Sequence, residues 1–438
     1  MKIYWFRLTK GIKNYNLKLF YRSLSNIPEI NKSPRTIKLL NYKYSTDNWT
    51  NITPKIISHL GQNLHIAKNH PLSYVRQRII NHFYKSYLNR LGNPLFSVYD
   101  NINPIVTTVQ NFDSLLIPID HVSRAKSDCY YINQETLLRA HTTAHQAELI
   151  ALGLDNFLII GDVYRRDEID CTHYPVFHQV DGVRLCTMEQ IFKNVRDPSK
   201  LNIFEYGSNE SIDKQRYHTL EAVKIMEYDL KKTLVGLVQT LFGKDIKYRW
   251  VNQIFPFTHP SWELEICFND KWLEILGCGI IRQEILHKTG AVDRIGWAFG
   301  LGLERLAMCL YSIPDIRLFW STDSGFLNQF VTDNINSSIT YKPISLHPQC
   351  TNDISFWLPQ DIEYSSNDFY DIVREIGGDK VEQILLIDTY VNPKTKRTSH
   401  CYKIVYRHME RVLSQEEVNK IHKQIEITIS KQLNVVIR

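Results

Sequence analysis

Residues 161–182, GDVYRRDEIDCTHYPVFHQVDG, gather the side chains of this chain that are best suited to chemistry. Two adjacent arginines, Arg165 and Arg166, stand among acids, and His173 and Phe177 follow. If a strand, a loop and a returning strand bring Arg165 opposite Phe177, the guanidinium can pair with a phosphate while the ring stacks on a base. The stretch therefore predicts a nucleotide-binding hairpin with His173 near the phosphates. Taken alone, Arg-Arg-Asp is also typical of a surface cluster of ion pairs.

Two further segments carry groups that suit ligand binding. In GWAFGLGLERLAM at 296–308, glycines let the backbone approach a ligand, and Arg305 lies at the start of a helix. The alternative is ordinary helix packing with an exposed Arg–Glu pair. In LLRAHTTAHQAELI at 137–150, polar groups cluster just before a helix, although a capped helix start has the same appearance. These groups are His141, Thr143, His145 and Gln146.

A pair of phenylalanines occurs in QIFPFTHPSWELEI. Phe255 and Phe257 are two residues apart, so in a strand both rings point to the same side. Such rings either belong to a hydrophobic core or form the wall of an aromatic pocket.

The elements that must position these groups alternate between helix and strand. Residues 69–92 have the apolar spacing of one amphipathic helix that begins at His-Pro and ends at Gly92. Between about 95 and 310, the runs FLIIGDVYR, RWVNQIF, SWELEICF and WLEILGCGII are typical of strands. GLGLERLAMCLY then has helical spacing. The pattern predicts an α+β domain with a large, mostly antiparallel sheet and flanking helices.

The last part of the chain has an order of its own. After a polar stretch at 323–344, interpreted as a linker, a strand, a helix, two strands, a helix beginning at Ser414 and a final strand follow. This βαββαβ order predicts a ferredoxin-like domain at 345–438. The turn and strands at 394–411 carry an excess of positive charge, which suits contacts with phosphates or forms a solvated face; the cations are Lys394, Lys396, Arg397, Lys403, Arg407 and Arg411 against Glu410.

The formal charge of +6 is unevenly distributed. Residues 1–40 contain nine Lys or Arg and one acid, a net of +8, so the remainder nets −2. This Ser- and Asn-containing segment has no apolar core and predicts a mitochondrial transit peptide, with a basic nucleic-acid-binding arm as the alternative.

No apolar run is long enough to span a bilayer. The eight cysteines have no CxxC pair, which favours free thiols over disulfides or zinc.

Taken together, the segments resemble the class II aminoacyl-tRNA synthetases, and within them the single-chain, mitochondrial type of phenylalanyl-tRNA synthetase. VYRRD…FHQ resembles motif 2 of that class and GLGLERL its motif 3, while residues 69–92 with NFDSLLIPIDHVSR resemble motif 1. NFDSLLIP, FHQVDG, FPFTHP, LGCGI and GWAFGLGLERLAM are similar to signatures of the phenylalanine enzymes. NDISFWLP and TSHCYKIVYRHMER resemble the family's ferredoxin-fold anticodon-binding domain. The resemblance runs from residue 69 to 438.

The resemblance implies a role for each matching residue. In catalysis, Arg165 would hold the α-phosphate of ATP, Arg305 the γ-phosphate, and His173 would lie near the phosphates. Phe177 would stack on adenine and Glu274 would lie near the ATP. Phenylalanine would bind with its polar groups at His141, Thr143, Gln146, Gln179 and Asp181, and with its ring against Phe255 and Phe257, above Gly277, Gly279 and Ala298. Ala144, His145, Asp167, Phe299 and Gly300 complete the implied substrate and ATP site.

The resemblance also implies the reaction and its partners. The phenylalanine carboxylate would attack the α-phosphorus of ATP, and the 2′-hydroxyl of the terminal adenosine of tRNA(Phe) would then take the acyl group. ATP with Mg²⁺ is the implied cofactor, without zinc, and the implied enzyme is a monomer of the mitochondrial matrix that binds no membrane. Lys394, Lys396, Arg397, Lys403 and Arg407 would contact the tRNA. The implied domains are a transit peptide at 1–40, a catalytic domain at 41–322, the linker and the anticodon-binding domain.

Three positions depart from the family pattern. Asp181 stands where Glu is usual, Thr143 where Ser is usual, and Val122 where Pro is usual. Because Asp is one methylene shorter than Glu, its contact with an ammonium can require a bridging water. Two rival functions make different predictions. The alternative of a catalytically inactive, synthetase-like tRNA-binding protein predicts damaged arginines or a missing anticodon domain, and the sequence has neither. A small-molecule amide ligase on the same fold would lack the βαββαβ unit.

Overall fold

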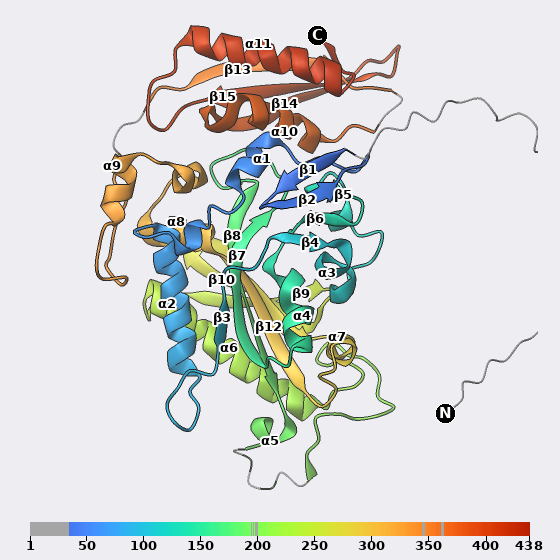
Figure 1. Ribbon diagram of the computed structural model, residues 1–438, viewed down its shortest axis with the longest axis vertical. Helices are drawn as coiled ribbons and strands as arrows, with labels where there is room; N and C mark the ends of the chain where they lie inside the picture. Colours follow the sequence, from blue (N-terminus) through green and yellow to red (C-terminus); the bar gives the residue numbers. More distant parts are fainter. Residues whose placement is uncertain (1–34, 194, 196, 198–199, 344–346, 361–362) are drawn as a thin grey trace, which may run out of the picture.

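The computed structural model describes residues 35–193, 195, 197, 200–343, 347–360 and 363–438 (Figure 1). Most of the predicted transit peptide, residues 1–34, therefore lies outside the described residues. Its last part does not: β1 (Thr36–Leu39) pairs with β2 (Tyr42–Ser45) in an antiparallel hairpin, and Leu39 is buried in the core. Among the described helices, none is both long enough and apolar enough to cross a membrane.

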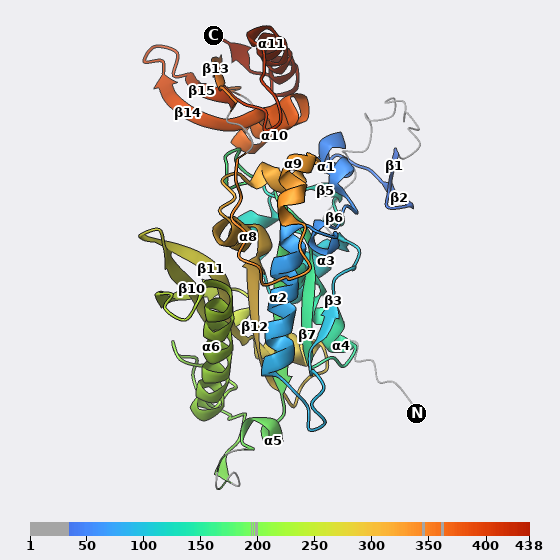
Figure 2. The same ribbon diagram turned by 90° about the vertical axis from the view of Figure 1, so that its left-hand side faces the viewer.

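A seven-stranded sheet forms the centre of the larger domain (Figures 1 and 2). All neighbouring strands are antiparallel except β3 and β7, which are parallel, so the predicted sheet is confirmed. The four predicted runs are β7, β9, β10 and β11. In spatial order the strands are β3 (Ser97–Tyr99), β7 (Asn156–Tyr164), β8 (Val176–Cys186), β12 (Ile295–Gly302), β11 (Lys271–Ile281), β10 (Thr258–Phe268) and β9 (Tyr248–Phe255).

Strand register brings residues from distant segments into one row. Asp181 on β8 is opposite Gly300 on β12, which is opposite Gly277 on β11, which is opposite Glu263 on β10. Two adjacent glycines leave the sheet without side chains between the two acids. The row is therefore a shallow floor on which a ligand can lie.

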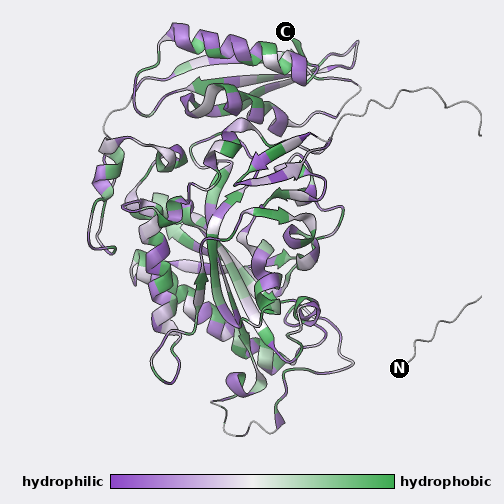
Figure 3. Ribbon diagram, viewed as in Figure 1, coloured by the Kyte–Doolittle hydropathy of each residue, from purple (hydrophilic) through white to green (hydrophobic). Residues whose placement is uncertain are grey.

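Helices cover both faces of this sheet. On one face, α2 (Pro71–Ser86), α6 (Leu220–Phe242) and α8 (Leu303–Tyr311) pack into the largest hydrophobic cluster. On the other, α4 (Gln146–Ala151) and α7 (Gln283–Lys288) pack against β7, β8 and β12. Figure 3 shows the hydrophobic residues gathered in the central strands.

The predicted helix at 69–92 extends six residues beyond the C-terminal end of α2. The chain leaves the helix after Ser86, where Tyr87 adopts an extended conformation with φ −127° and ψ 98°. Leu88 then forms a bridge with Pro94, so the following residues make a tight loop. The 23-residue helix α6 was not among the expected elements, although Thr219 caps it and its buried residues recur at helical spacing.

Smaller elements complete the domain. A three-stranded sheet has the order β4, β6, β5, and short helices connect the larger elements. Their bounds are β4 (Ile105–Thr107), β5 (Tyr131–Asn133), β6 (Thr136–Leu138), α1 (Pro54–His59), α3 (Thr108–Asn111), α5 (Met188–Ile191) and α9 (Ser324–Leu327), with 3₁₀ turns at Leu64–Ile66, Asp113–Leu115, Val122–Arg124, Thr142–His145, Ile316–Trp320, Asn328–Phe330 and Gly378–Lys380.

Of the segment interpreted as a linker, 323–344, the described residues 323–343 pack on the larger domain. Phe326, Phe330 and Tyr341 are buried in the main hydrophobic cluster, and their rings contact one another at 5.1 and 5.6 Å. The polar residues between them hid this apolar spacing in the sequence.

The C-terminal domain has the predicted βαββαβ order. Its antiparallel sheet has the strand order β14, β15, β13, β16, and both helices pack on one cluster of buried residues. Ser414 accepts a hydrogen bond from the Glu417 amide and caps the last helix, as expected. The elements are β13 (Cys350–Trp357), α10 (Ser366–Gly377), β14 (Val381–Val391), β15 (Thr398–Tyr406), α11 (Gln415–Gln432) and β16 (Val436–Ile437).

Candidate active site

A cavity of about 620 Å³ lies on the glycine floor of the sheet. Its walls combine apolar rings with a few polar groups, the composition typical of a small-molecule site. Most of the predicted substrate residues line it, namely His141, Thr143, Gln146, Gln179, Asp181, Phe255, Phe257, Gly277, Ala298, Phe299 and Gly300.

A second cavity, of about 580 Å³, lies beside the first and has fewer acidic residues in its lining. The predicted nucleotide residues His173, Phe177 and Arg305 line it. The two cavities share five lining residues, so they are two ends of one site: Arg165, Asp167, Gln179, Glu274 and Gly300.

Arg165 stands where the two cavities meet. Its Nε donates to the Ala140 carbonyl at 2.7 Å, and its guanidinium carbon lies 5.3 Å from the centre of the Phe177 ring. The ring and the arginine come together because Val163 and Phe177 are paired on β7 and β8. Within the described part of the chain Arg165 forms no ion pair, and burial lowers its pKa. A half-buried cation without a carboxylate partner is prepared for an anionic ligand.

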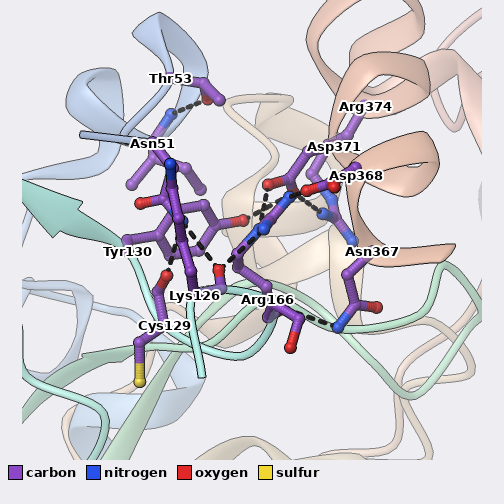
Figure 4. A network of polar contacts seen from close by, with 12 residues as sticks. Asn51, Thr53, Lys126, Cys129, Tyr130, Arg166, Asn367, Asp368, Asp371 and Arg374 are labelled. Carbon is purple, nitrogen blue, oxygen red and sulfur yellow. Dashed lines mark hydrogen bonds and ion pairs between the residues drawn. The ribbon is translucent and has the colours of Figure 1, made fainter. Parts of the chain in front are cut away.

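Arg166 has a different environment from its neighbour (Figure 4). Its Nε donates to Asp371 at 2.6 Å and its Nη2 to Asp368 at 2.7 Å, and both acids are on α10 of the C-terminal domain. Tyr130 donates to Asp371 at 2.9 Å. Arg374 donates to the Asp167 carbonyl at 2.8 Å. The second arginine of the pair therefore joins the two domains, which the sequence did not indicate.

Asp181 is the buried acid of the first cavity. Its carboxylate accepts a hydrogen bond from the Thr143 hydroxyl, and a side chain at Gly300 would come within 2.8 Å of it. Burial raises the pKa of Asp181 to about 6, even though Thr143 and the more distant Arg165 act in the opposite direction. Because burial disfavours the ionised form of Asp181, a cation bound in the cavity would stabilise that form.

The turn at 141–146 divides between the cavity and the core. His141, Thr143 and Gln146 line the cavity, and burial lowers the pKa of His141 to about 3, so it is neutral. Ala144 and His145, which were also predicted to bind substrate, line neither cavity; both are buried, with 1% and 3% of their surface exposed. A 3₁₀ turn places successive side chains on different sides, which the spacing alone does not reveal.

Two stacked rings form the apolar wall. The Phe255 and Phe257 rings are 5.9 Å apart and nearly parallel, at 5°. The expectation that both lie in one strand was wrong, because β9 ends at Phe255 and Phe257 lies in the turn before β10. A side chain at Gly277 would approach the Phe255 ring to 3.0 Å, so the glycine admits that ring.

Ala298 lines the cavity, whereas the Phe299 ring lies on the opposite face of the sheet. That ring stacks on Phe83 of α2 at 5.2 Å, so only the backbone of Phe299 is available to a ligand. Gly279 lines neither cavity: a side chain there would meet the Pro260 carbonyl at 2.6 Å. Its role is close strand packing, in contrast to the predicted room for substrate.

Two basic side chains lie at the rim of the second cavity. Arg305 donates to the Glu274 carbonyl at 2.9 Å and lies 3.5 Å from its carboxylate, and both side chains are about half exposed. His173 forms a hydrogen bond with Asp170 at 2.7 Å, and this contact raises the pKa of His173.

Val122, one of the departures from the family pattern, is 73% exposed in a turn near the first cavity.

The basic residues of the C-terminal domain differ in their surroundings. Among the described residues, Lys394, Lys396, Arg397 and Lys403 form no ion pair, whereas Arg407 pairs with Glu382.

Sequence reasoning missed an aromatic group beside these basic residues. Arg397 and Arg438 each lie 5.4 Å from the centre of the Trp357 ring, and Arg438 also lies 5.0 Å from Tyr390. The two rings are 6.0 Å apart. Strand pairing across distant segments creates this cluster, so no local signal announced it.

Comparison with known proteins gives concordant matches. Residues 56–196 and 204–330 match the tRNA synthetases class II core domain (F), and residues 345–438 match the ferredoxin-fold anticodon binding domain. The probable mitochondrial phenylalanine–tRNA ligase of Drosophila melanogaster is 60% identical over 425 residues, 93% of each chain. The mitochondrial phenylalanine–tRNA ligase of Mus musculus is 56% identical over 399 residues, 91% of this chain and 88% of the relative. That of Rattus norvegicus is 53% identical over 422 residues, 92% and 89%.

Proposed function

The chain belongs to the mitochondrial phenylalanine–tRNA ligases, class II aminoacyl-tRNA synthetases, and from this premise we propose which residues carry out each step. It attaches phenylalanine to tRNA(Phe) in mitochondria at the expense of ATP. The observation that carries the assignment of residues is the junction of the two cavities at Arg165. A ligand that fills both must have an apolar end, an anionic centre and a planar base, which is the form of an aminoacyl-adenylate.

Phenylalanine occupies the first cavity in this assignment. Its ring packs against Phe255 and Phe257, and Ala298 closes the cavity beneath it. Its ammonium pairs with Asp181, whose ionised form is disfavoured by burial when no cation is bound. Because Asp181 is fixed by Thr143 and lies over Gly300, the ammonium has one position, and the carboxylate then points toward Arg165. His141, Gln146 and Gln179 supply the remaining polar contacts of the substrate.

ATP occupies the second cavity. Adenine stacks on Phe177, Arg165 binds the α-phosphate and Arg305 binds the γ-phosphate, with His173 beside the phosphates. The carboxylate attacks the α-phosphorus and pyrophosphate leaves. No dedicated base is needed, because the attacking carboxylate is already ionised and the barrier falls through positioning and charge neutralisation.

Mg²⁺ enters with ATP as part of the substrate and neutralises charge on the phosphates. The exposed carboxylate of Glu274, which lines both cavities, supplies the type of oxygen ligand that Mg²⁺ prefers. In the second half of the reaction, the 2′-hydroxyl of the terminal adenosine attacks the acyl carbon and AMP leaves. The open side of the first cavity, at Ile254 and His121, gives the tRNA end its access.

The C-terminal domain binds the tRNA. We assign phosphate contacts to Lys394, Lys396, Arg397 and Lys403, which have no competing acid among the described residues, and a weaker one to Arg407, which already pairs with Glu382. Beside them, Trp357 and Tyr390 with two arginines offer stacking surfaces for unpaired bases. Anticodon bases are unpaired and so fit this surface.

The remaining assignments concern domains and place of action. The enzyme is mitochondrial; we assign it to the matrix and to a monomeric state. We assign the transit peptide to the first 34 residues, because β1 begins at Thr36 and Leu39 packs in the core. The catalytic domain then runs from there to about 343, including the packed residues 323–343, and the anticodon-binding domain occupies 345–438.

The experiment that tests this function is ATP–pyrophosphate exchange with each of the twenty amino acids, followed by charging of tRNA(Phe). Phenylalanine alone should support strong exchange, because a tyrosine hydroxyl has no partner between the rings and Ala298. Burial of an unpaired hydroxyl costs about 1–3 kcal/mol, so discrimination of tenfold or more is expected from binding. Equal exchange with tyrosine contradicts the assignment of the cavity. An inactive tRNA-binding protein would give no exchange at all.

A further inference from the structure

A buried ion pair lies directly beneath the turn that lines the phenylalanine cavity. Arg139 precedes that turn and is 1% exposed. Its Nη2 is 2.6 Å from the Asp162 carboxylate, and its Nε donates to the Asp162 carbonyl at 2.6 Å. The Tyr164 hydroxyl donates to the second carboxylate oxygen of Asp162. Burial, the largest single effect, would raise the pKa of Asp162, but the charge of Arg139 and the hydrogen bonds from Tyr164 and Arg139 together outweigh it and lower that pKa below its usual value.

The remaining nitrogen of Arg139 reaches the turn itself. Nη1 lies 3.1 Å from Nε2 of His145 and 3.2 Å from the Ile102 carbonyl. A guanidinium can only donate, so Nε2 of His145 must be the acceptor and its ring is neutral with the proton on Nδ1. Burial and the charge of Arg139 act in the same direction and lower the pKa of His145 to about 3.

The backbone of the same segment continues to the nucleotide end. The Arg139 carbonyl accepts a hydrogen bond from the Tyr164 amide at 2.9 Å, and the Ala140 carbonyl accepts one from Nε of Arg165 at 2.7 Å. Asn111, which is fully buried, accepts from the Ala140 amide at 3.0 Å. The turn is therefore fixed at three points around Arg139.

The opposite strand leaves space for the guanidinium. A side chain at Gly161 on β7 would come within 2.2 Å of Nη2 of Arg139. Even one methyl group there would displace the arginine. Glycine, which has no side chain beyond a hydrogen atom, leaves the space that the guanidinium occupies.

We propose that Arg139 and His145 are positioning residues for phenylalanine binding: the buried guanidinium, held by Asp162, fixes His145 and so sets the turn that presents His141, Thr143 and Gln146 to the cavity. Neither residue touches the substrate. The hydrogen bond matters because three contacts of one ligand depend on one short turn, and a shift of that turn moves all three together. This inference rests on the proposed placement of phenylalanine in the first cavity.

The test compares His145→Ala with His145→Gln in ATP–pyrophosphate exchange by the full chain. The alanine variant should raise KM for phenylalanine about tenfold or more and change KM for ATP less than twofold. The glutamine variant should restore KM for phenylalanine to within about threefold, because its amide oxygen can accept from Arg139. A purely structural role would lower Tm without this separation of the two KM values. His70→Ala is the matched control, since His70 is equally buried and bonds the Phe319 carbonyl away from the turn.

Gly161→Ala provides a second, independent approach to the same contact. By displacing the guanidinium, it should raise KM for phenylalanine in the same way. It should not add to His145→Ala in the double variant, because a displaced guanidinium no longer donates to residue 145 and that hydrogen bond is already lost. An unchanged KM for phenylalanine in folded His145→Ala overturns the inference, as does an equal rise in both KM values that glutamine fails to correct. Failure of the unmodified enzyme to show phenylalanine-dependent exchange would instead overturn the proposed function.

Discussion

Replacement of Asp181 by asparagine should make the ligand-free enzyme more stable and phenylalanine binding weaker. Asp181 is 5% exposed, and its carboxylate accepts a hydrogen bond from the Thr143 hydroxyl but forms no ion pair among the described residues. Burial raises its pKa from 3.8 to about 6, which means that the folded chain resists its ionisation. An asparagine has nearly the same shape without the charge.

The magnitude follows from the shift in pKa. About two pH units at 1.36 kcal/mol each correspond to about 3 kcal/mol. Because the folded pKa lies above the unfolded one, this group favours folding below pH 4 and that contribution is lost as the pH rises through about 6. Asp181→Asn should therefore raise the free energy of unfolding by up to about 3 kcal/mol at pH 8 and by almost nothing at pH 4.

Binding should respond in the opposite sense. A bound ammonium stabilises the ionised carboxylate, so KM for phenylalanine should rise about tenfold per pH unit below pH 6 in the unmodified enzyme. In Asp181→Asn this dependence should vanish and KM at pH 8 should be about 100-fold higher, the equivalent of about 3 kcal/mol.

The assay combines thermal unfolding at pH 4 and pH 8 with exchange kinetics across the same range. Asp371→Asn serves as the contrasting control: Asp371 is equally buried but paired with Arg166, so its loss should lower Tm. If Asp181→Asn lowers Tm at pH 8, or leaves KM for phenylalanine unchanged, the reasoning about an unpaired buried carboxylate is wrong.

Three further predictions concern other parts of the site. Arg165→Ala and Arg305→Ala should each reduce the rate of exchange by about 10²–10³-fold with normal circular dichroism, since loss of such an electrostatic contact costs roughly 3–4 kcal/mol in the transition state; near-normal exchange would disprove the role of either arginine. Ala298→Gly should admit para-chlorophenylalanine in exchange, because Ala298 lines the base of the cavity; continued rejection of that analogue would place the base elsewhere. Neutralising Lys394, Lys396 and Arg397 together should weaken tRNA binding and reduce its salt slope by about 0.7–0.9 for each phosphate that the protein no longer neutralises, whereas an unchanged affinity and slope would place the tRNA on another surface.

The sequence predicted the elements whose signals are local. Alternating apolar runs identified β7, β9, β10 and β11, and the order of elements identified the C-terminal domain. Most of the residues that the family resemblance names line one of the two cavities, and those on β8, β11 and β12 are brought together by the pairing of these strands.

The sequence could not reveal which side of a turn a residue faces or which distant residue it meets. His145 was expected in the site but faces Arg139, because a 3₁₀ turn alternates its side chains. Arg166 is 205 positions from Asp371, its partner. Gly279 has the same local pattern as Gly277, yet the irregular register between Thr258 and Ser261 brings the Pro260 carbonyl against it.

The contacts between the two domains also determine whether the catalytic domain can be studied without the C-terminal domain. Arg166 and Arg317 are 7% and 6% exposed, and both donate to groups of the C-terminal domain. Removal of residues 345–438 would leave the buried cation of Arg166 without its two carboxylates, at a cost of several kcal/mol. Arg317 would keep its ion pair with Asp315 but lose its carbonyl acceptors in the C-terminal domain. Adenylation should therefore be studied in the full chain.

The central claim is that one phenylalanyl-adenylate fills both cavities across Arg165. A crystal structure with a non-hydrolysable phenylalanyl-adenylate analogue measures this directly. We expect the phosphate within about 3 Å of the Arg165 guanidinium, adenine on Phe177, the ammonium at Asp181, and the ring centroid roughly 4.5–7 Å from those of Phe255 and Phe257. Adenine seated in the first cavity, or a phosphate that does not reach Arg165, would contradict this claim.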